Sequence, residues 1–122
     1  MRFFKCEVCG KIIAAVNTKP CPTMCCGKEM VEMVPNTVDA AKEKHVPVCK
    51  VNGNIVEVVV GEVAHPMTEE HQIDWIAIET ETGNQRKVLK AGAEPKATFA
   101  LVDGDKLKAA YAYCNLHGLW KA

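Results

Sequence analysis

The sequence has no long hydrophobic run, no net charge and no recognisable export signal. No apolar stretch approaches the roughly 20 residues that a membrane-spanning helix needs, so we expect no transmembrane segment. Fifteen basic residues balance 15 acidic ones, which argues against binding to nucleic acid or to a membrane surface. The first residues lack the regions of a signal peptide, so we expect a cytoplasmic, reducing setting.

Histidine is missing from the first 44 residues, and this gap divides the chain chemically. All four histidines come later, whereas five of the seven cysteines lie within the first 26 residues. An odd number of cysteines cannot be fully paired within one chain, and in a reducing compartment thiols are more often metal ligands or catalysts than disulfides. With 48% apolar residues, a chain of 122 can hold one core and a small stapled module. We therefore predict two sites of different chemistry.

The early cysteines occur in two segments that both end in Cys-Gly-Lys. Cys-x-x-Cys-Gly-Lys begins at residue 6, and Cys-Cys-Gly-Lys begins at residue 25. Glycine at such a turn lets backbone N–H groups point at the sulfurs, and four thiolates suit tetrahedral zinc or a single iron. The predicted ligands are Cys6, Cys9, Cys25 and Cys26. Because the second pair is adjacent, we expect a distorted tetrahedron.

Two alternatives stay open for these cysteines. Cys21 and Cys25 form a Cys-x-x-x-Cys pair, but we favour Cys25 with Cys26 because that segment repeats the Gly-Lys ending, which leaves Cys21 as a spare thiol. A redox dithiol of the thioredoxin kind would need a βαβ context, which the sequence does not predict. A module of about 35 residues has little core of its own, so metal binding and self-association would have to stabilise it.

The rest of the chain is patterned as β-strands. Pro35 marks a boundary, and residues 38–42 predict no more than one helical turn because no capping box supports a longer helix. Strands are predicted at residues 46–51, 55–60, 73–79, 85–89, 96–102 and 106–114. The first two flank Asn-Gly-Asn and the last two flank Asp-Gly-Asp, so each of these pairs is predicted to form a hairpin. Short strands at this spacing predict an antiparallel β-sandwich.

Potential metal donors fall at the predicted strand ends or in loops, where a sandwich can gather them. Cys114 and His117 lie three residues apart, so one tight turn can direct both at a single metal. Cys-x-x-His alone is a weak signal, and its weight depends on donors elsewhere in the chain. The other candidates are His45, His65 and His71.

Taken together, these motifs resemble the desulfoferrodoxin family, the two-iron type of superoxide reductase, along nearly the whole chain. Besides the early cysteines, the resemblance rests on Glu43-Lys44-His45-Val46-Pro47, Ala64-His65-Pro66-Met67, Glu70-His71 and the segment YCNLHGLWK at residues 113–121. It implies an all-β fold, with a desulforedoxin-like four-cysteine iron module at 1–36 and an immunoglobulin-like superoxide reductase domain at 37–122. It also implies a second iron, with Cys114 as its axial ligand and His45, His65, His71 and His117 as its equatorial ligands.

The resemblance further implies the activity. One electron and two protons would convert superoxide into hydrogen peroxide without release of oxygen, and five donors favour a redox metal over zinc, which prefers four. Lys44 would attract the superoxide anion, although a lysine in a charged run is more often merely solvated. Glu43 would approach the oxidised iron as a sixth ligand. The implied partners are a rubredoxin-like electron donor and a second copy of the chain in a homodimer.

Three other functions remain open at this point. The chain could be an electron-transfer protein that works through the four-cysteine iron, or a zinc-ribbon binding module fused to a sandwich. It could also be a dismutase, which would oxidise superoxide as well and release oxygen. The native electron donor, an electron relay between the two sites, the order of protonation and the roles of Cys21 and Cys49 are not determined by the sequence.

Overall fold

The computed structural model describes all residues, 1–122, and divides them into two compact units, residues 1–34 and 35–122. The fold is all-β as predicted, because the only helix is a single turn, α1 (Lys42–His45). No helix in it has the length and apolar composition that crossing a membrane requires.

The first unit is built from very short strands. β1 (Phe3–Lys5) pairs antiparallel with β2 (Ile12–Ala14) and with β5 (Val31–Glu32), and β3 (Met24–Cys25) pairs with β4 (Lys28–Glu29). Its buried side chains are few, namely Phe3, Cys6 and Met30. So small a core supports the expectation that this unit needs another source of stability.

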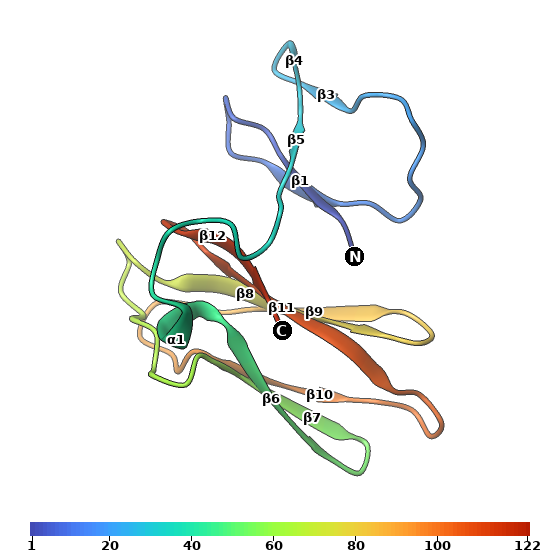
Figure 1. The fold of residues 1–122 in the computed structure, drawn as a ribbon, viewed down its shortest axis with the longest axis vertical. Coiled ribbons are helices and arrows are strands. Elements are labelled where there is room, and N and C mark those ends of the chain that lie inside the picture. The colour runs from blue at the N-terminus through green and yellow to red at the C-terminus, as the bar shows by residue number, and fades with distance from the viewer. The chain divides into compact units, whose positions relative to one another are not determined.

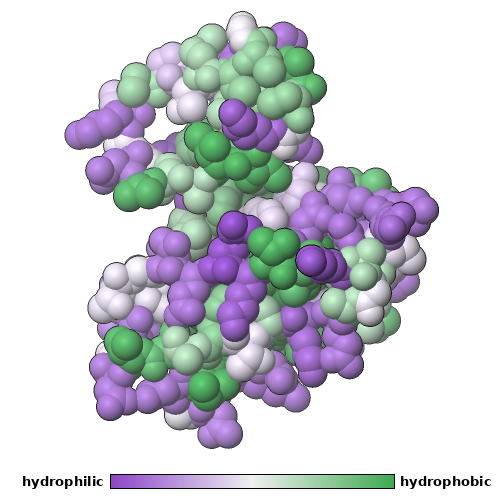
Figure 2. Space-filling view, turned by 180° about the vertical axis from the view of Figure 1, so that it is seen from behind, coloured by the Kyte–Doolittle hydropathy of each residue, from purple (hydrophilic) through white to green (hydrophobic).

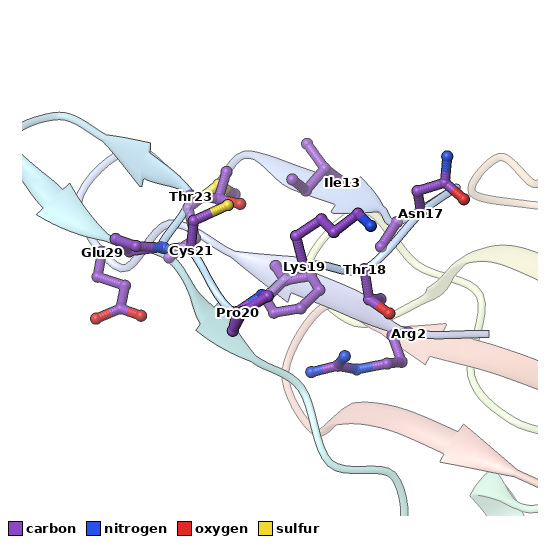
Figure 3. A pocket seen from close by; sticks show the side chains of 13 residues that line it. Arg2, Ile13, Asn17, Thr18, Lys19, Pro20, Cys21, Thr23 and Glu29 are labelled. Atoms are coloured by element: carbon purple, nitrogen blue, oxygen red, sulfur yellow. The ribbon is translucent and has the colours of Figure 1, made fainter.

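A hollow of about 560 Å³ lies against the 17–23 loop of the first unit (Figure 3). Its lining combines polar side chains such as Arg2 and Lys19 with the thiol of Cys21. Cys21 is the only cysteine that lines it, so the hollow is distinct from the other four cysteines of this unit.

The second unit is a sandwich of two antiparallel sheets, whose layers are visible in Figure 1. The three-stranded sheet has the order β10-β7-β6, made of β6 (Pro47–Asn52), β7 (Ile55–Val60) and β10 (Lys96–Ala100). The four-stranded sheet has the order β12-β11-β8-β9, made of β8 (Ile73–Thr80), β9 (Asn84–Val88), β11 (Leu107–Cys114) and β12 (Gly118–Lys121).

The core of the sandwich follows the two-residue period of its strands. Every second residue of β7 (Val56, Val58 and Val60) is fully buried, and Phe99 from β10 joins them. Ile78 of β8 belongs to the same cluster from the facing sheet. Burial of each such side chain contributes about 1.5–3 kcal/mol. The surface seen in Figure 2 is mostly polar over this unit and is broken by separate apolar spots.

Side chains of the edge strand β9 of one sheet form hydrogen bonds with the backbone of the edge strand β10 of the other sheet. Gln85 on β9 donates from Nε2 to the carbonyl of Ala100 at 2.9 Å, and the Lys87 ammonium donates to the carbonyl of Thr98. Both acceptors belong to β10, whose outer edge has no strand partner. A polar or charged side chain at such an edge blocks pairing with another chain.

One predicted hairpin is confirmed and the other is wrong. β6 and β7 pair around Gly53 as predicted, with Asn52 opposite Ile55. In contrast, β10 pairs with β7, and β11 pairs with β8 and β12, so residues 101–106 carry the chain from one sheet to the other. An Asp-Gly turn signals a reversal of the chain but not the strand that becomes the partner. In a sandwich some connections must cross from one sheet to the other, and the turn between β10 and β11 is such a connection.

Two smaller predictions are also corrected. The helical turn lies at Lys42–His45, later than the predicted 38–42, and its N-cap residue, Ala41, provides no side-chain hydrogen bond. The segment after Cys114 is not the end of the sheet, because β12 follows and pairs Gly118 with Cys114. The missed strand is only four residues long, too short for an alternating pattern to reveal.

Candidate metal centres

The four cysteines of the first unit form a compact cluster. The sulfur atoms of Cys6, Cys9, Cys25 and Cys26 all lie within 4.8 Å of one another. Cys9 and Cys25 are 3.8 Å apart and Cys25 and Cys26 3.9 Å apart, sulfur to sulfur. A tetrahedron with metal–sulfur bonds of about 2.3 Å has edges of about 3.8 Å, so the cluster has the size of a four-thiolate metal site. Cys21 is outside it.

The turns that carry these cysteines need the left-handed backbone region. Gly10 has φ 80° and Gly27 has φ 73°, which cost glycine little. Cys26 has φ 52°, a conformation that costs a residue with a side chain about 1 kcal/mol or more. The adjacent Cys25 and Cys26 are therefore brought together by a turn that is strained at Cys26.

The thiols of the cluster differ in acidity. The backbone N–H of Cys9 donates to the Cys6 sulfur at 3.5 Å, which lowers the pKa of Cys6 to about 6. The neighbouring sulfurs of Cys9 and Cys25 raise the pKa of Cys26 to about 12. Without a metal the first thiolate forms readily and the last does not. Four thiolates at this spacing fit a bound metal ion.

The donors of the second unit meet at one end of the sandwich because of its antiparallel register. Pro47 pairs with Val60, so the segment before β6 and the segment after β7 share an end. The start of β8 pairs with the end of β11, and β12 starts beside it. α1 and the 61–72 segment lie at this end, opposite the tips of the β6–β7 and β8–β9 hairpins (Figure 1). His45 is on α1, His65 and His71 are on the 61–72 segment, and His117 is in the turn between β11 and β12.

Distances between ring nitrogens confirm that the donors converge. One nitrogen from each of His45, His65 and His71 and the sulfur of Cys114 lie within 4.8 Å of one another. His117 joins them, with Nδ1 lying 3.1 Å from Nε2 of His45 and 3.8 Å from the Cys114 sulfur. The two sheets thus bring together four imidazoles and one thiol.

The orientation of the rings fits a cation at their centre. His45 and His65 each place Nδ1 at 2.7 Å from a backbone carbonyl, of Ala41 and Pro66, so Nδ1 carries the proton and Nε2 a lone pair. These two Nε2 atoms are only 3.2 Å apart, and two lone pairs repel unless a cation lies between them. Nε2 of His71 is buried and has no hydrogen-bond partner. A metal satisfies all three atoms.

Burial keeps three of the imidazoles, those of His45, His65 and His71, neutral. Burial lowers the pKa of His65 to about 4 and also lowers the pKa values of His45 and His71. Burial raises the pKa of the Cys114 thiol, while backbone N–H groups of Leu116 and His117 act in the opposite direction. A metal is therefore what would hold this sulfur as a thiolate.

Trp120 supports two of the imidazoles and was not predicted as a site residue. Its ring stacks on His45 with centroids 4.8 Å apart, and its Nε1–H donates to the carbonyl of His117 at 3.1 Å. Asn36, in the left-handed region at φ 63°, holds the adjacent β12 edge through two side-chain hydrogen bonds with Lys121. Trp120 follows the Cys-x-x-His motif on β12, but its stacking partner His45 is 75 residues away in the chain, so no local pattern marked it as a site residue.

Lys44 and Glu43 are both exposed side chains on α1, directly before His45. Burial is the main cause of the lowered pKa of His71, followed by the charges of His117 and His45, and the charge of Lys44 contributes least. The Glu43 carboxylate is not among the donor atoms gathered within 4.8 Å. Cys49 is half-buried on β6, packs against the core and belongs to neither cluster.

Fold and donor sets together define a two-centre, non-haem metalloprotein with a β-sandwich. Residues 37–122 match the model of the desulfoferrodoxin family. A desulfoferrodoxin homolog from Archaeoglobus fulgidus is 48% identical over 122 residues, which cover 100% of this chain and 96% of that protein. The chain belongs to the desulfoferrodoxin family, and its two donor clusters match the two iron centres of that family.

Solved structures agree with this assignment. The superoxide reductase from Treponema pallidum is 39% identical and superposes with a TM-score of 0.83 over 98% of each chain. The superoxide reductase (1Fe-SOR) from Giardia intestinalis is 42% identical with a TM-score of 0.57, over 66% of this chain and 96% of its own. The predicted resemblance is confirmed.

Proposed function

We propose that this chain is a superoxide reductase, which converts superoxide, one electron and two protons into hydrogen peroxide without releasing oxygen. The observation that carries the proposal is the convergence of four imidazoles and one buried thiol at one end of the sandwich. Two of the similar solved structures, from Treponema pallidum and Giardia intestinalis, are named superoxide reductases.

The proposed ligands of the catalytic iron are Nε2 of His45, His65 and His71, Nδ1 of His117 and the sulfur of Cys114. When bound, this iron supplies a one-electron redox centre with an electron-donating thiolate. Burial keeps the imidazoles of His45 and His65 neutral, the form in which they can bind the iron. Backbone N–H groups near Cys114 take up part of the negative charge of its sulfur.

Lys44 and Glu43 are proposed to act on the substrate side. The Lys44 ammonium attracts the superoxide anion, a role supported by its exposed position on α1 directly before His45. Glu43 directly precedes Lys44 on α1. We propose that Glu43 moves toward the oxidised centre after turnover, because its side chain is exposed and lies on the same helical turn as His45.

The remaining family features belong to the same proposal. Cys6, Cys9, Cys25 and Cys26 would hold an iron in a domain spanning residues 1–36, with the reductase domain at 37–122. The electron would come from a rubredoxin-like carrier, and the working form would be a cytoplasmic homodimer.

Metal analysis and product analysis test the function together. We expect two irons per chain, consumption of superoxide with an added electron donor, and formation of peroxide without oxygen. Oxygen release would indicate a dismutase, and zinc in both centres would support a zinc-ribbon module. Iron in the four-cysteine centre alone, with no superoxide consumption, would leave electron transfer as the function.

Lys44→Ile tests the steering role. We expect superoxide consumption at low ionic strength to slow by about 10-fold, with iron content unchanged, because the attracting charge is lost. The difference should shrink as salt is added, since screening weakens steering. The matched control is Lys106→Ile, which removes an exposed lysine near the opposite end of the sandwich. Equal rates for both variants would exclude the role of Lys44.

A further inference from the structure

The four imidazoles of the second centre are not held alike. The rings of His45 and His65 are each oriented by a hydrogen bond to a backbone carbonyl. The ring of His71 makes no such bond, and its buried Nε2 has no partner. The direction in which this ring points therefore depends on the backbone that carries it.

Thr68 holds the backbone of His71 from the N-terminal side. Its hydroxyl accepts a hydrogen bond from the His71 N–H at 3.1 Å and lies 3.3 Å from the His71 carbonyl, to which it donates. The Thr68 N–H donates to the same carbonyl at 3.0 Å. Both backbone polar groups of His71 are therefore satisfied by one residue.

Asn115 holds the two neighbours of His71 from the opposite side. Its Oδ1 accepts the N–H of Gln72 at 2.9 Å, and its Nδ2 donates to the carbonyl of Glu70 at 3.0 Å. The Asn115 N–H donates to the Gln72 carbonyl at 3.1 Å. Asn115 directly follows Cys114, so these bonds join the segment of the thiol to the segment of the imidazole.

We propose that Thr68 and Asn115 are positioning residues that form a clamp on residues 70–72 and direct the His71 ring at the iron. The proposal rests on the metal site of the proposed function. The clamp satisfies five backbone groups in three residues, whereas the imidazole itself makes no hydrogen bond. Because Asn115 is next to Cys114, the clamp also sets the distance between the thiolate and this imidazole.

Iron retention and redox potential of the intact protein test the clamp. Asn115→Ala and Thr68→Val remove the side-chain bonds, whereas Thr68→Ser retains the hydroxyl. We expect the first two to release the second-centre iron to a chelator about 10–100-fold faster and to shift its midpoint potential, with Thr68→Ser close to the native protein. The four-cysteine iron serves as an internal reference and should not change.

A matched control separates the clamp from general destabilisation. Asn54→Ala removes an asparagine whose Nδ2 donates to Asp103 at the far hairpin tip. Asn115→Asp, which keeps the Oδ1 acceptor and loses the donor, serves if the alanine variant does not fold.

The clamp would be overturned if Thr68→Val and the Asn115 variant both released the second-centre iron at the native rate with the native midpoint potential. It would also be overturned if Asn54→Ala released this iron as fast as those variants do. If the native chain holds no iron at the second centre, the proposed function fails too. That result is visible before any variant is made.

Discussion

A single methyl group at Gly61 should disturb the second metal centre. A Cβ at this position would lie 2.6 Å from the carbonyl oxygen of Glu43, 2.9 Å from the carbonyl carbon of Lys44 and 3.1 Å from the nitrogen of His45. Ordinary contact begins at 3.4 Å, so α1 and residue 61 must separate by up to 0.8 Å. All three neighbours are backbone atoms of the turn that carries a proposed ligand, and none can rotate away.

The size of the effect follows from that displacement. Overpacking of this kind costs about 1–3 kcal/mol of stability, and each kcal/mol lowers the melting temperature of a domain of this size by roughly 4–8 °C. Because a misplacement of about 1 Å can cost about 100-fold in rate, we expect Gly61→Ala to slow superoxide consumption by about 10-fold or more. It should also speed the release of iron from the second centre.

Gly83→Ala is the matched control for this prediction. A Cβ at Gly83, in the β8–β9 turn, meets no atom within 4 Å. Thermal unfolding, iron release to a chelator and superoxide consumption should therefore be close to those of the native chain. If Gly61→Ala behaved like Gly83→Ala in all three measurements, close packing of α1 would not be what holds His45.

Two further predictions follow from the chemistry of the second centre. Cys114→Ser should abolish the visible thiolate-to-iron absorption of the oxidised protein while the four-cysteine iron keeps its own spectrum; persistence of the band would exclude Cys114 as a ligand. In the metal-free protein, burial holds the pKa of His65 at about 4, against 6.5 for an ordinary histidine, so the unfolded chain binds more protons as the pH falls. Stability of the metal-free sandwich should therefore be full above about pH 6.5 and decline toward pH 4, as urea unfolding followed by tryptophan fluorescence would measure; a flat profile over this range would contradict the burial of that imidazole.

Local patterns in the sequence predicted most of the sandwich strands and the four cysteines of the first cluster, whereas the donor set of the second cluster was implied by the family resemblance. Short apolar, β-branched runs between turn residues predicted β7 and β8 within a residue or two, because such a run reflects the burial of the strand itself. The β6–β7 hairpin was predictable because Asn-Gly acts over a few residues. The cysteine segments, with their glycines, carry the turn geometry of the first cluster in their own backbone.

Pairing of β10 and β11 was not predictable from the same signals. The turn between them is as good a hairpin signal as the correct one, yet the two strands belong to different sheets. Strand pairing is decided by which apolar faces must be buried together, and this involves residues far apart in the chain. In the first unit, β3 and β4 were too short, at two residues each, to leave a periodic signal.

The sequence alone determined the kinds of donor atoms, their division into a sulfur cluster and an imidazole cluster, and the strand ends that carry them. Tertiary structure decided how those atoms meet: which ring nitrogen faces the centre, which carbonyls orient the imidazoles, and how Thr68 and Asn115 hold His71. The reason is physical. Residue type and local turns depend on nearby chain, whereas the meeting of His45 with His117, 72 residues apart, depends on the antiparallel register of two packed sheets.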